Sequence, residues 1–368
     1  MDSYNVFLPA YSVGVDCYKE IAWITKKYGK KAVAIGGKTA IEKSRDDLIK
    51  GIQGSEVEIS DFIWYGGNST YENVEMLKSM KIVQESDMIF AIGGGRAVDT
   101  CKTLGDMLGK PVFTFPTVSS NCAACTCIAV IYNSDGTFRE YYYPKTPPQH
   151  TFINTRIIAE SPEDLLWAGI GDALSKEYEV LLATKGKKLF HTPLLGAQLS
   201  KACTLPLIEL GKKAMADCKN NIPSYELQQV ALDIIISTGI VSNLTSKQDS
   251  YYYNSSLAHA FYYGSTVIEG CENHLHGEIV AFGVLCLLTY EKKFDEREKI
   301  CKFNKSINLP VCLEDLSLTT EDLQMITDKA KTVIEWTCTP EKVTEEKFIK
   351  AILDCDEYGR KQKYQREK

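Results

Sequence analysis

The sequence lacks several features that would define a membrane, secreted or multi-linker protein. No run of eighteen apolar residues occurs in its 368 residues, so no transmembrane helix is expected. Its first five residues, MDSYN, lack the basic and then apolar pattern of a secretory signal, and we expect a cytoplasmic location. Tracts of Pro, Gly or Ser that would form a long linker are also missing. The hydrophobic content of 44% and the charged content of 24% are typical of a globular protein.

The chain has no excess of positive charge and no cysteine framework. Its net charge of −6 gives no electrostatic footprint for nucleic acid, and the basic segment 359–363 is expected to be solvated. The thirteen cysteines are scattered without the spacings of a disulfide scaffold. We therefore expect reduced thiols, and neither a nucleic acid nor a membrane as partner.

Histidine is scarce but clustered. Only five histidines occur, and His259, His274 and His276 fall within eighteen residues. Neutral imidazole is the commonest nitrogen ligand of divalent metals, so the cluster indicates a metal site, with satisfied core or capping histidines as the alternative. A carboxylate from elsewhere should complete the ligand set. Asp172, in Gly-Ile-Gly-Asp-Ala-Leu, is the best candidate and is expected in the first turn of a helix, where a plain N-cap is the alternative.

The two parts of the sequence differ in their periodicity. Short β-rich runs at 32–35, 62–65, 88–92 and 112–115 alternate with helical patterns such as 71–85 and 96–108, which predicts a parallel sheet with ligands at the carboxyl ends of its strands. Beyond Pro162 helical patterns follow one another, at 197–218, 227–244, 279–294 and 320–336. Because proline restricts the residue before it, we place the boundary there. The sequence predicts an α/β domain over residues 1–161 and an all-helical domain over residues 162–368.

Two loops of the α/β part have ligand-binding character. The run Gly93-Gly94-Gly95-Arg96 follows a buried strand and begins a helix, so backbone amides could approach a pyrophosphate, although a tight turn that needs glycine is an equal alternative. Val98 occupies the place of the third fingerprint glycine. Loop 116–127 carries hydroxyls that could donate to phosphate and ribose oxygens. A simple polar turn, or a thiol site at its three cysteines, is the alternative.

Five motifs occur in a fixed order along the chain. They are Gly-Gly-Gly-x-x-x-Asp-x-x-Lys, Pro-Thr-x-x-Ser, Gly-x-Gly-Asp-Ala-Leu, His-Ala-x-x-x-Gly and His-Gly-Glu-x-Val-Ala-Phe-Gly. In this order they resemble the iron-containing (group III) alcohol dehydrogenases, and within them the glycerol dehydrogenase branch. The resemblance covers roughly residues 30–290.

The resemblance implies a fold and a set of site residues. The fold is an N-terminal dinucleotide-binding domain followed by a helical domain, with a divalent metal in the cleft between them. The implied catalytic metal ligands are Asp172, His259 and His276, with a fourth position left for water or the substrate oxygen. The implied nucleotide contacts are Gly37, Gly94, Gly95, Arg96, Thr117, Ser120, Thr126, Ile128 and Tyr132.

The resemblance also implies an activity. The reaction is hydride transfer between NAD or NADP and a small alcohol, polyol or 2-hydroxy acid, with the metal stabilising an alkoxide or polarising a carbonyl. Zinc is expected first, because the glycerol branch is associated with zinc, with iron or manganese as alternatives. Relatives commonly form dimers or larger rings, so a homo-oligomer is expected. The alternative activity is that of a metal-dependent lyase or cyclase resembling dehydroquinate synthase.

Two positions depart from the glycerol-type pattern. The family's polyol-binding aspartate is replaced by Cys122, which predicts a substrate contact there and a preference for a 2-hydroxy acid or a less polar hydroxyketone over glycerol. Loss of a carboxylate about 5 Å from an anionic substrate relieves roughly 3 kcal/mol of repulsion at an effective dielectric near 20. Gly37 and Lys38 stand where NAD-selective relatives tend to place an acid, so NADP should be tolerated.

Overall fold

The computed structural model describes residues 4–364 and contains two compact units. The first comprises the described residues up to Leu166 together with Ala216–Asn243. The second comprises Trp167–Met215 and the chain from Leu244 onward. The segment Ala216–Asn243 thus clusters with the α/β unit, although its helical periodicity resembles that of the later segments.

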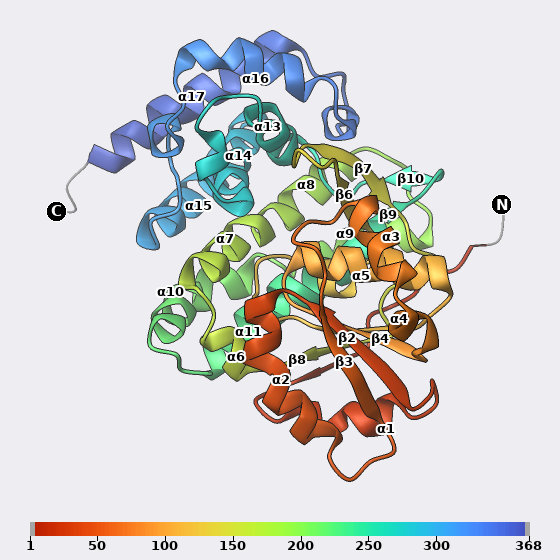
Figure 1. Ribbon diagram of the computed structural model, residues 1–368. Coiled ribbons are helices and arrows are strands. Elements are labelled where there is room, and N and C mark those ends of the chain that lie inside the picture. Colours follow the sequence, from red (N-terminus) through yellow and green to blue (C-terminus); the bar gives the residue numbers. More distant parts are fainter. Residues whose placement is uncertain (1–3, 365–368) are drawn as a thin grey trace. The chain divides into compact units, whose positions relative to one another are not determined.

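The first unit contains a six-stranded sheet, of which β2, β3, β4 and β8 are labelled in Figure 1. Its strand order is β1-β8-β5-β4-β2-β3, and all neighbouring strands are parallel. The strands are β1 (Tyr11–Val13), β2 (Lys31–Gly36), β3 (Glu58–Trp64), β4 (Met88–Ile92), β5 (Val112–Phe115) and β8 (His150–Ile153). Helices cover both faces. Along β4, Phe90 packs in the hydrophobic cluster that includes Leu48 of α2, whereas Ile89 packs with Leu104 of α5 on the opposite face. The predicted α/β fold is confirmed.

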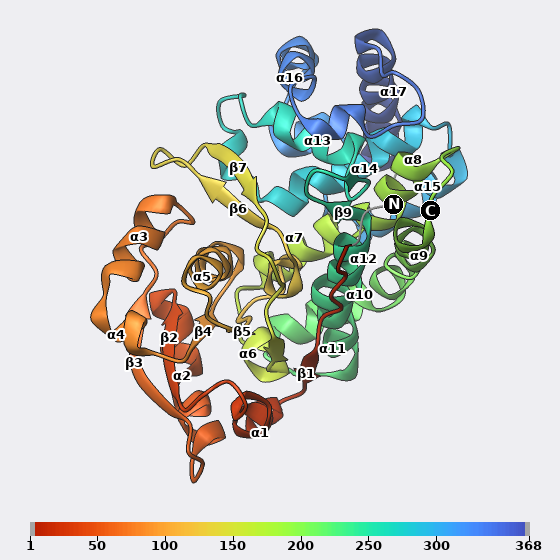
Figure 2. The same cartoon turned by 90° about the vertical axis from the view of Figure 1, so that its right-hand side faces the viewer.

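The remaining elements of this unit are helices and one hairpin. The hairpin joins β6 (Ala129–Tyr132) to β7 (Phe138–Tyr142), and Figure 2 shows it beside α5. The helices are η1 (Cys17–Glu20), α1 (Ile21–Thr25), α2 (Lys38–Ile52), α3 (Tyr71–Ser79), α4 (Lys81–Glu85), α5 (Gly95–Leu108), η2 (Ala123–Cys125), α6 (Thr155–Ala159), α11 (Tyr225–Leu232), the π-helical η3 (Asp233–Ser237) and α12 (Thr238–Thr245), the last of which continues into the second unit.

The second unit is helical, as the sequence predicts, apart from the short pair β9 (Ser246–Lys247) and β10 (Tyr251–Tyr252). Two of its helices begin or end in the first unit, α7 (Glu163–Ala173) and α10 (Leu205–Lys219). The others are α8 (Ser175–Thr184), α9 (His191–Ser200), α13 (Leu257–Ser265), η4 (Cys271–Asn273), α14 (His276–Tyr290), α15 (Phe294–Ser306), η5 (Leu313–Leu316), η6 (Thr320–Asp322), α16 (Leu323–Ala330), η7 (Ile334–Thr337) and α17 (Glu345–Tyr364).

One apolar helical stretch has the length of a membrane-spanning helix. Among the described residues, Tyr225–Thr245 is long and apolar enough to cross a membrane, but 67% of its apolar window is buried within the fold. A buried core helix passes the same length and hydropathy test, so the stretch gives no argument for a membrane.

Candidate functional site

Three predicted metal ligands meet in the second unit. Asp172, His259 and His276 each offer one ligand atom, and these atoms all lie within 4.8 Å of one another. Oδ1 of Asp172 lies 3.5 Å from Nε2 of His259 and 3.1 Å from Nε2 of His276. Two ligands of a tetrahedral divalent ion at about 2.05 Å are roughly 3.3 Å apart, so these two separations leave room for one such ion between the residues.

Each ligand is carried by a different helix. Asp172 lies near the end of α7, His259 in the first turn of α13 and His276 at the first position of α14. The expectation that Asp172 begins a helix is wrong. The glycines before it lie inside α7, and a Cβ on Gly171 would stand only 2.3 Å from the carbonyl oxygen of Gly277. Glycine is needed here for the close approach of α7 and α14, which brings Asp172 to His276.

The electrostatics of the cluster favour a positive charge at its centre. Burial opposes ionisation of Asp172, yet the neighbouring imidazoles of His276 and His259 hold the pKa of its carboxyl well below the usual range. Burial would lower the pKa of His259, but Glu179 and Asp172 raise it to about 10. A divalent cation bound by one carboxylate and two imidazoles would satisfy the same field. The donor set therefore fits a zinc, iron or manganese ion.

A fourth residue, which the sequence analysis missed, stands behind the cluster. Glu179 of α8 is fully buried, and its Oε2 lies 2.6 Å from Nδ1 of His259. Asp172 and Glu179 are seven residues apart, a spacing that places two side chains on one face of helical structure. The spacing alone does not point to Glu179, because it gains meaning only when the position of His259 in the structure is known.

Four of the nucleotide contacts predicted by the resemblance, Gly37, Gly94, Gly95 and Arg96, follow the carboxyl ends of β2 and β4 in the first unit. The chain leaves β2 to form the edge strand β3 and returns to form β4 on the other side, and such a switch point is where open α/β sheets bind ligands. Gly93 has φ of 134°, which favours glycine, and a Cβ there would lie 3.8 Å from the backbone nitrogen of Gly37. Gly94 is the N-cap of α5, so the backbone N–H groups in the first turn of this helix have no partner within the helix and are available to an anion.

The polar loop 116–128 lies against the start of α5. A Cβ on Gly95 would stand 3.0 Å from Nδ2 of Asn121, and a Cβ on Gly94 would stand 3.2 Å from Cγ2 of Val118. Thr117 is buried and Ser120 is partly buried in this loop. Cys122, also partly buried, precedes η2. The loop therefore brings Val118 and Asn121 to the glycine turn, and the predicted contacts Thr117, Ser120 and Cys122 are near them in sequence.

Two further predicted contacts, Thr126 and Ile128, are held beside α5 by a lysine that belongs to a buried ion pair. Nζ of Lys102 lies 2.8 Å from Oδ1 of Asp99, and it donates to the carbonyl oxygens of Ala123, Thr126 and Ile128. Lys102 thus holds the backbone of the loop between Ala123 and Ile128. The Arg96 guanidinium lies over the ring of Tyr132, 5.3 Å from its centre.

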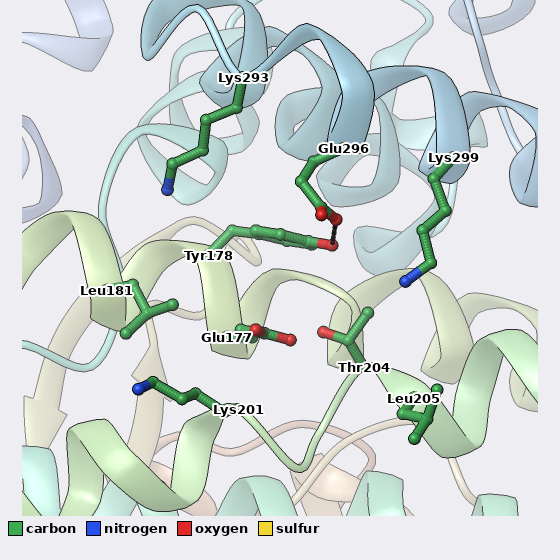
Figure 3. Close-up of a pocket in the computed structure, with 9 residues that line it drawn as sticks. All are labelled: Glu177, Tyr178, Leu181, Lys201, Thr204, Leu205, Lys293, Glu296 and Lys299. Atoms are coloured by element: carbon green, nitrogen blue, oxygen red, sulfur yellow. Dashed lines mark hydrogen bonds between the residues drawn. The ribbon is translucent and has the colours of Figure 1, made fainter.

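A separate pocket of about 320 Å³ lies in the second unit (Figure 3). Its lining is Glu177, Tyr178, Leu181, Lys201, Thr204, Leu205, Lys293, Glu296 and Lys299. Tyr178 donates a hydrogen bond of 3.1 Å to Glu296 across it. None of the three clustered metal ligands lines this pocket, so we do not place the chemistry there.

Comparisons with known proteins identify the family of the chain. The family model for iron-containing alcohol dehydrogenase matches residues 9–155. A glycerol dehydrogenase of Thermotoga maritima is 30% identical over 308 residues, which cover 81% of this chain and 82% of that protein. Hydroxycarboxylate dehydrogenase A of Escherichia coli (strain K12) is 29% identical over 299 residues, or 80% of each chain.

A solved structure extends the likeness over nearly the whole chain. The crystal structure of a probable glycerol dehydrogenase from Sinorhizobium meliloti superposes with a TM-score of 0.85 at 24% identity, covering 98% of this chain and 100% of that one. That likeness shows the shared fold, and the identity to the Thermotoga maritima protein shows the family. The chain therefore belongs to the iron-containing alcohol dehydrogenase family, in its glycerol dehydrogenase-like branch.

Proposed function

We propose that the protein transfers hydride between NAD(P) and a small alcohol or the corresponding carbonyl compound, with a bound divalent metal. The observation that carries this proposal is the cluster of Asp172, His259 and His276 in a chain whose α/β unit has a glycine turn at its switch point. Both features belong to the family, and the relatives compared above give the lyase alternative no support.

The three clustered residues would hold the metal. When bound, a divalent cation would act as a Lewis acid on the oxygen of the substrate. One carboxylate and two imidazoles are a common ligand set of catalytic zinc, which supports zinc as the first choice over iron and manganese. The side chain of His276 is 38% exposed, against 13% for His259, so an incoming oxygen would reach the cluster beside His276.

The α/β unit would hold the nucleotide. The turn of Gly94, Gly95 and Arg96 would take the pyrophosphate, with the helix start and the guanidinium both favouring negative charge. At the end of β2, Gly37 has no carboxylate to repel a 2′-phosphate, and the ammonium of Lys38 lies over the ring of Trp64, 4.8 Å from its centre. These features support acceptance of NADP as well as NAD.

The substrate proposal rests on Cys122. A neutral thiol where the glycerol-type enzymes carry an aspartate favours a 2-hydroxy acid or a less polar hydroxyketone over glycerol. The relation to a hydroxycarboxylate dehydrogenase supports the same preference. A cytoplasmic location and a homo-oligomeric assembly complete the proposal. The location is supported by the thirteen cysteines, which form no disulfide among the described residues.

The proposal is tested by following NADH and NADPH oxidation with dihydroxyacetone, 2-oxobutyrate, 2-oxoglutarate and simple aldehydes, using protein of known metal content. We expect turnover of 2-oxobutyrate with either nucleotide. Chelation of the metal or His259→Ala should lower kcat about a thousandfold or more, because a Lewis acid contributes several kcal/mol. Activity confined to dihydroxyacetone would return the protein to glycerol chemistry. The absence of any oxidation by metal-loaded protein would contradict the dehydrogenase assignment.

A further inference from the structure

Glu179 makes three hydrogen bonds to the segment that carries His259. Its Oε1 accepts from the backbone nitrogens of Ser256, at 2.8 Å, and of His259, at 2.9 Å. Its Oε2 lies 2.6 Å from Nδ1 of His259. Both carboxylate oxygens are therefore engaged at the start of α13, and the side chain of Glu179 is 0% exposed.

The hydrogen bonds fix which nitrogen of the ring carries a proton. A carboxylate only accepts hydrogen bonds, so Nδ1 of His259 must donate to Glu179. In a neutral imidazole this leaves the lone pair on Nε2, the atom that lies 3.5 Å from Oδ1 of Asp172. The nitrogen that faces the other metal ligands is thus the one that is free to bind a cation.

We propose that Glu179 is a positioning residue for the metal site, which holds His259 in the Nδ1-protonated tautomer and turns Nε2 toward the cation. This inference rests on the proposed metal-binding function. A carboxylate behind a ligating histidine also makes the imidazole a stronger donor, and loss of such a partner lowers metal affinity about 10- to 100-fold. Glu179 acts through His259 and does not itself reach the ion.

A substitution by glutamine separates this role from simple space filling. Glu179→Gln keeps the shape of the side chain but has one oxygen for three donors. If that oxygen stays with the two backbone N–H groups, the amide nitrogen faces Nδ1 of His259 and donates to it. The ring proton then moves to Nε2, which can no longer bind metal. This isosteric change should therefore move the ring proton of His259 from Nδ1 to Nε2 and keep the hydrogen bonds at the start of α13.

The experiment measures Zn²⁺ affinity by competition with a chromogenic chelator. It compares the wild type, Glu179→Gln, His259→Ala and the double variant. We expect the single variant Glu179→Gln to bind zinc 10- to 100-fold more weakly than the wild type. In the His259→Ala background it should change the affinity by less than about twofold, because its effect passes through His259.

A matched control is another buried glutamate of the same unit. Glu335 is 1% exposed and accepts hydrogen bonds from the hydroxyls of Tyr252 and Ser255, which can rotate to suit an amide. Glu335→Gln should leave zinc affinity within about twofold of the wild type. Far-ultraviolet circular dichroism and NADH binding monitor the fold of every variant.

The outcomes separate this inference from the proposed function. If His259→Ala weakens zinc binding and Glu179→Gln does not, the positioning role is wrong and the metal site stands. An equal loss in the His259→Ala background would also overturn it, as a general structural effect. A wild type that does not bind zinc, iron or manganese would refute the metal site itself. Long-range ¹H–¹⁵N spectra of zinc-loaded wild type give an independent check, since a proton on Nε2 of His259 would contradict the proposal.

Discussion

The side chain at position 122 should set which carbonyl compounds the enzyme accepts. Cys122→Asp places a carboxylate in loop 116–128 and restores about 3 kcal/mol of repulsion against an anionic substrate. We expect the ratio of kcat/KM for 2-oxobutyrate to that for dihydroxyacetone to fall about 100-fold. The check is steady-state kinetics with both substrates. Cys122→Ser, which stays neutral, is the control, and an unchanged ratio in the aspartate variant would remove Cys122 from the substrate site.

A second residue, Asp233, should give the protein a characteristic pH dependence of stability. It is 3% exposed within the π-helical η3, and burial raises its pKa to about 8, although the Ser237 hydroxyl opposes this. Because the folded pKa lies above the unfolded value near 3.9, this carboxyl stabilises the fold at low pH, and the contribution is lost as pH rises toward 8.

Asp233→Asn is neutral at every pH and tests this linkage. Its free energy of unfolding, relative to the wild type, should increase by about 3 kcal/mol between pH 5.5 and pH 8, at roughly 1.4 kcal/mol per unit. Urea titrations at several pH values measure the difference. Other titrating groups are common to both proteins and cancel. A difference that does not vary with pH would show that Asp233 is ionised in the fold.

Which single residues could be identified from the sequence depends on how their signal arises. His259 and His276 were identified because imidazoles are rare and clustered in this chain. Glu179 was not identified, because a glutamate in a helix is ordinary unless the structure shows that it contacts His259. The sequence also put Asp172 at a helix start, since Gly169 and Gly171 read as a turn. Their purpose is the contact of α7 with α14, which only the tertiary structure contains.

Among the elements, α5 should hold the polar loop 116–128 in place chiefly through one ion pair. The side chains of Lys102 and Asp99 are 1% and 7% exposed, and the lysine also holds the carbonyls of loop residues Ala123, Thr126 and Ile128. Lys102→Met leaves a buried carboxylate without its cation. We expect a loss of about 3 to 5 kcal/mol in unfolding free energy and about tenfold weaker NADH binding.

Urea unfolding and NADH fluorescence check both effects. The double variant Asp99→Asn with Lys102→Met should recover part of the lost stability, since no unpaired charge remains. Lys78→Met, which removes a partly exposed lysine paired with Glu75, should change stability by less than about 0.5 kcal/mol. A Lys102→Met protein as stable as the Lys78→Met protein would refute the role of the buried pair.

The elements themselves were predictable where burial gives a long local pattern. Strands β4 and β5 have the predicted bounds, whereas β1 (YSV) and β8 (HTFI) were missed because each has only two hydrophobic residues. The helix predicted over 71–85 is interrupted at Met80, whose extended backbone (ψ of 124°) ends α3. The helix over 197–218 is likewise broken between Ser200 and Leu205. The break at Met80 has no proline or glycine beside it, whereas Pro206 in the first turn of α10 marks the second break.

At the scale of the whole molecule, local periodicity does not show which segments of the chain belong to which of the two units. The segment Ala216–Asn243 clusters with the α/β unit and contacts the polar loop 116–128. Cys125 donates to the carbonyl of Ile235, and the amide of Asn243 bonds the backbone of Cys125 and Cys127. These residues are more than 100 positions apart in sequence, so no local pattern could assign the segment.

This division predicts that metal and nucleotide stabilise different parts of the chain. All three proposed metal ligands lie in the second unit, and all predicted nucleotide contacts lie in the first. Zinc at 100 times its Kd should add about 2.7 kcal/mol to the stability of the unit that binds it. Hydrogen exchange should therefore show that chelation lowers protection in α8, α13 and α14, while NADH raises it in α5 and loop 116–128. Asp172→Asn should abolish the zinc effect and keep the NADH effect. Equal protection of both units by either ligand would mean that the units unfold together.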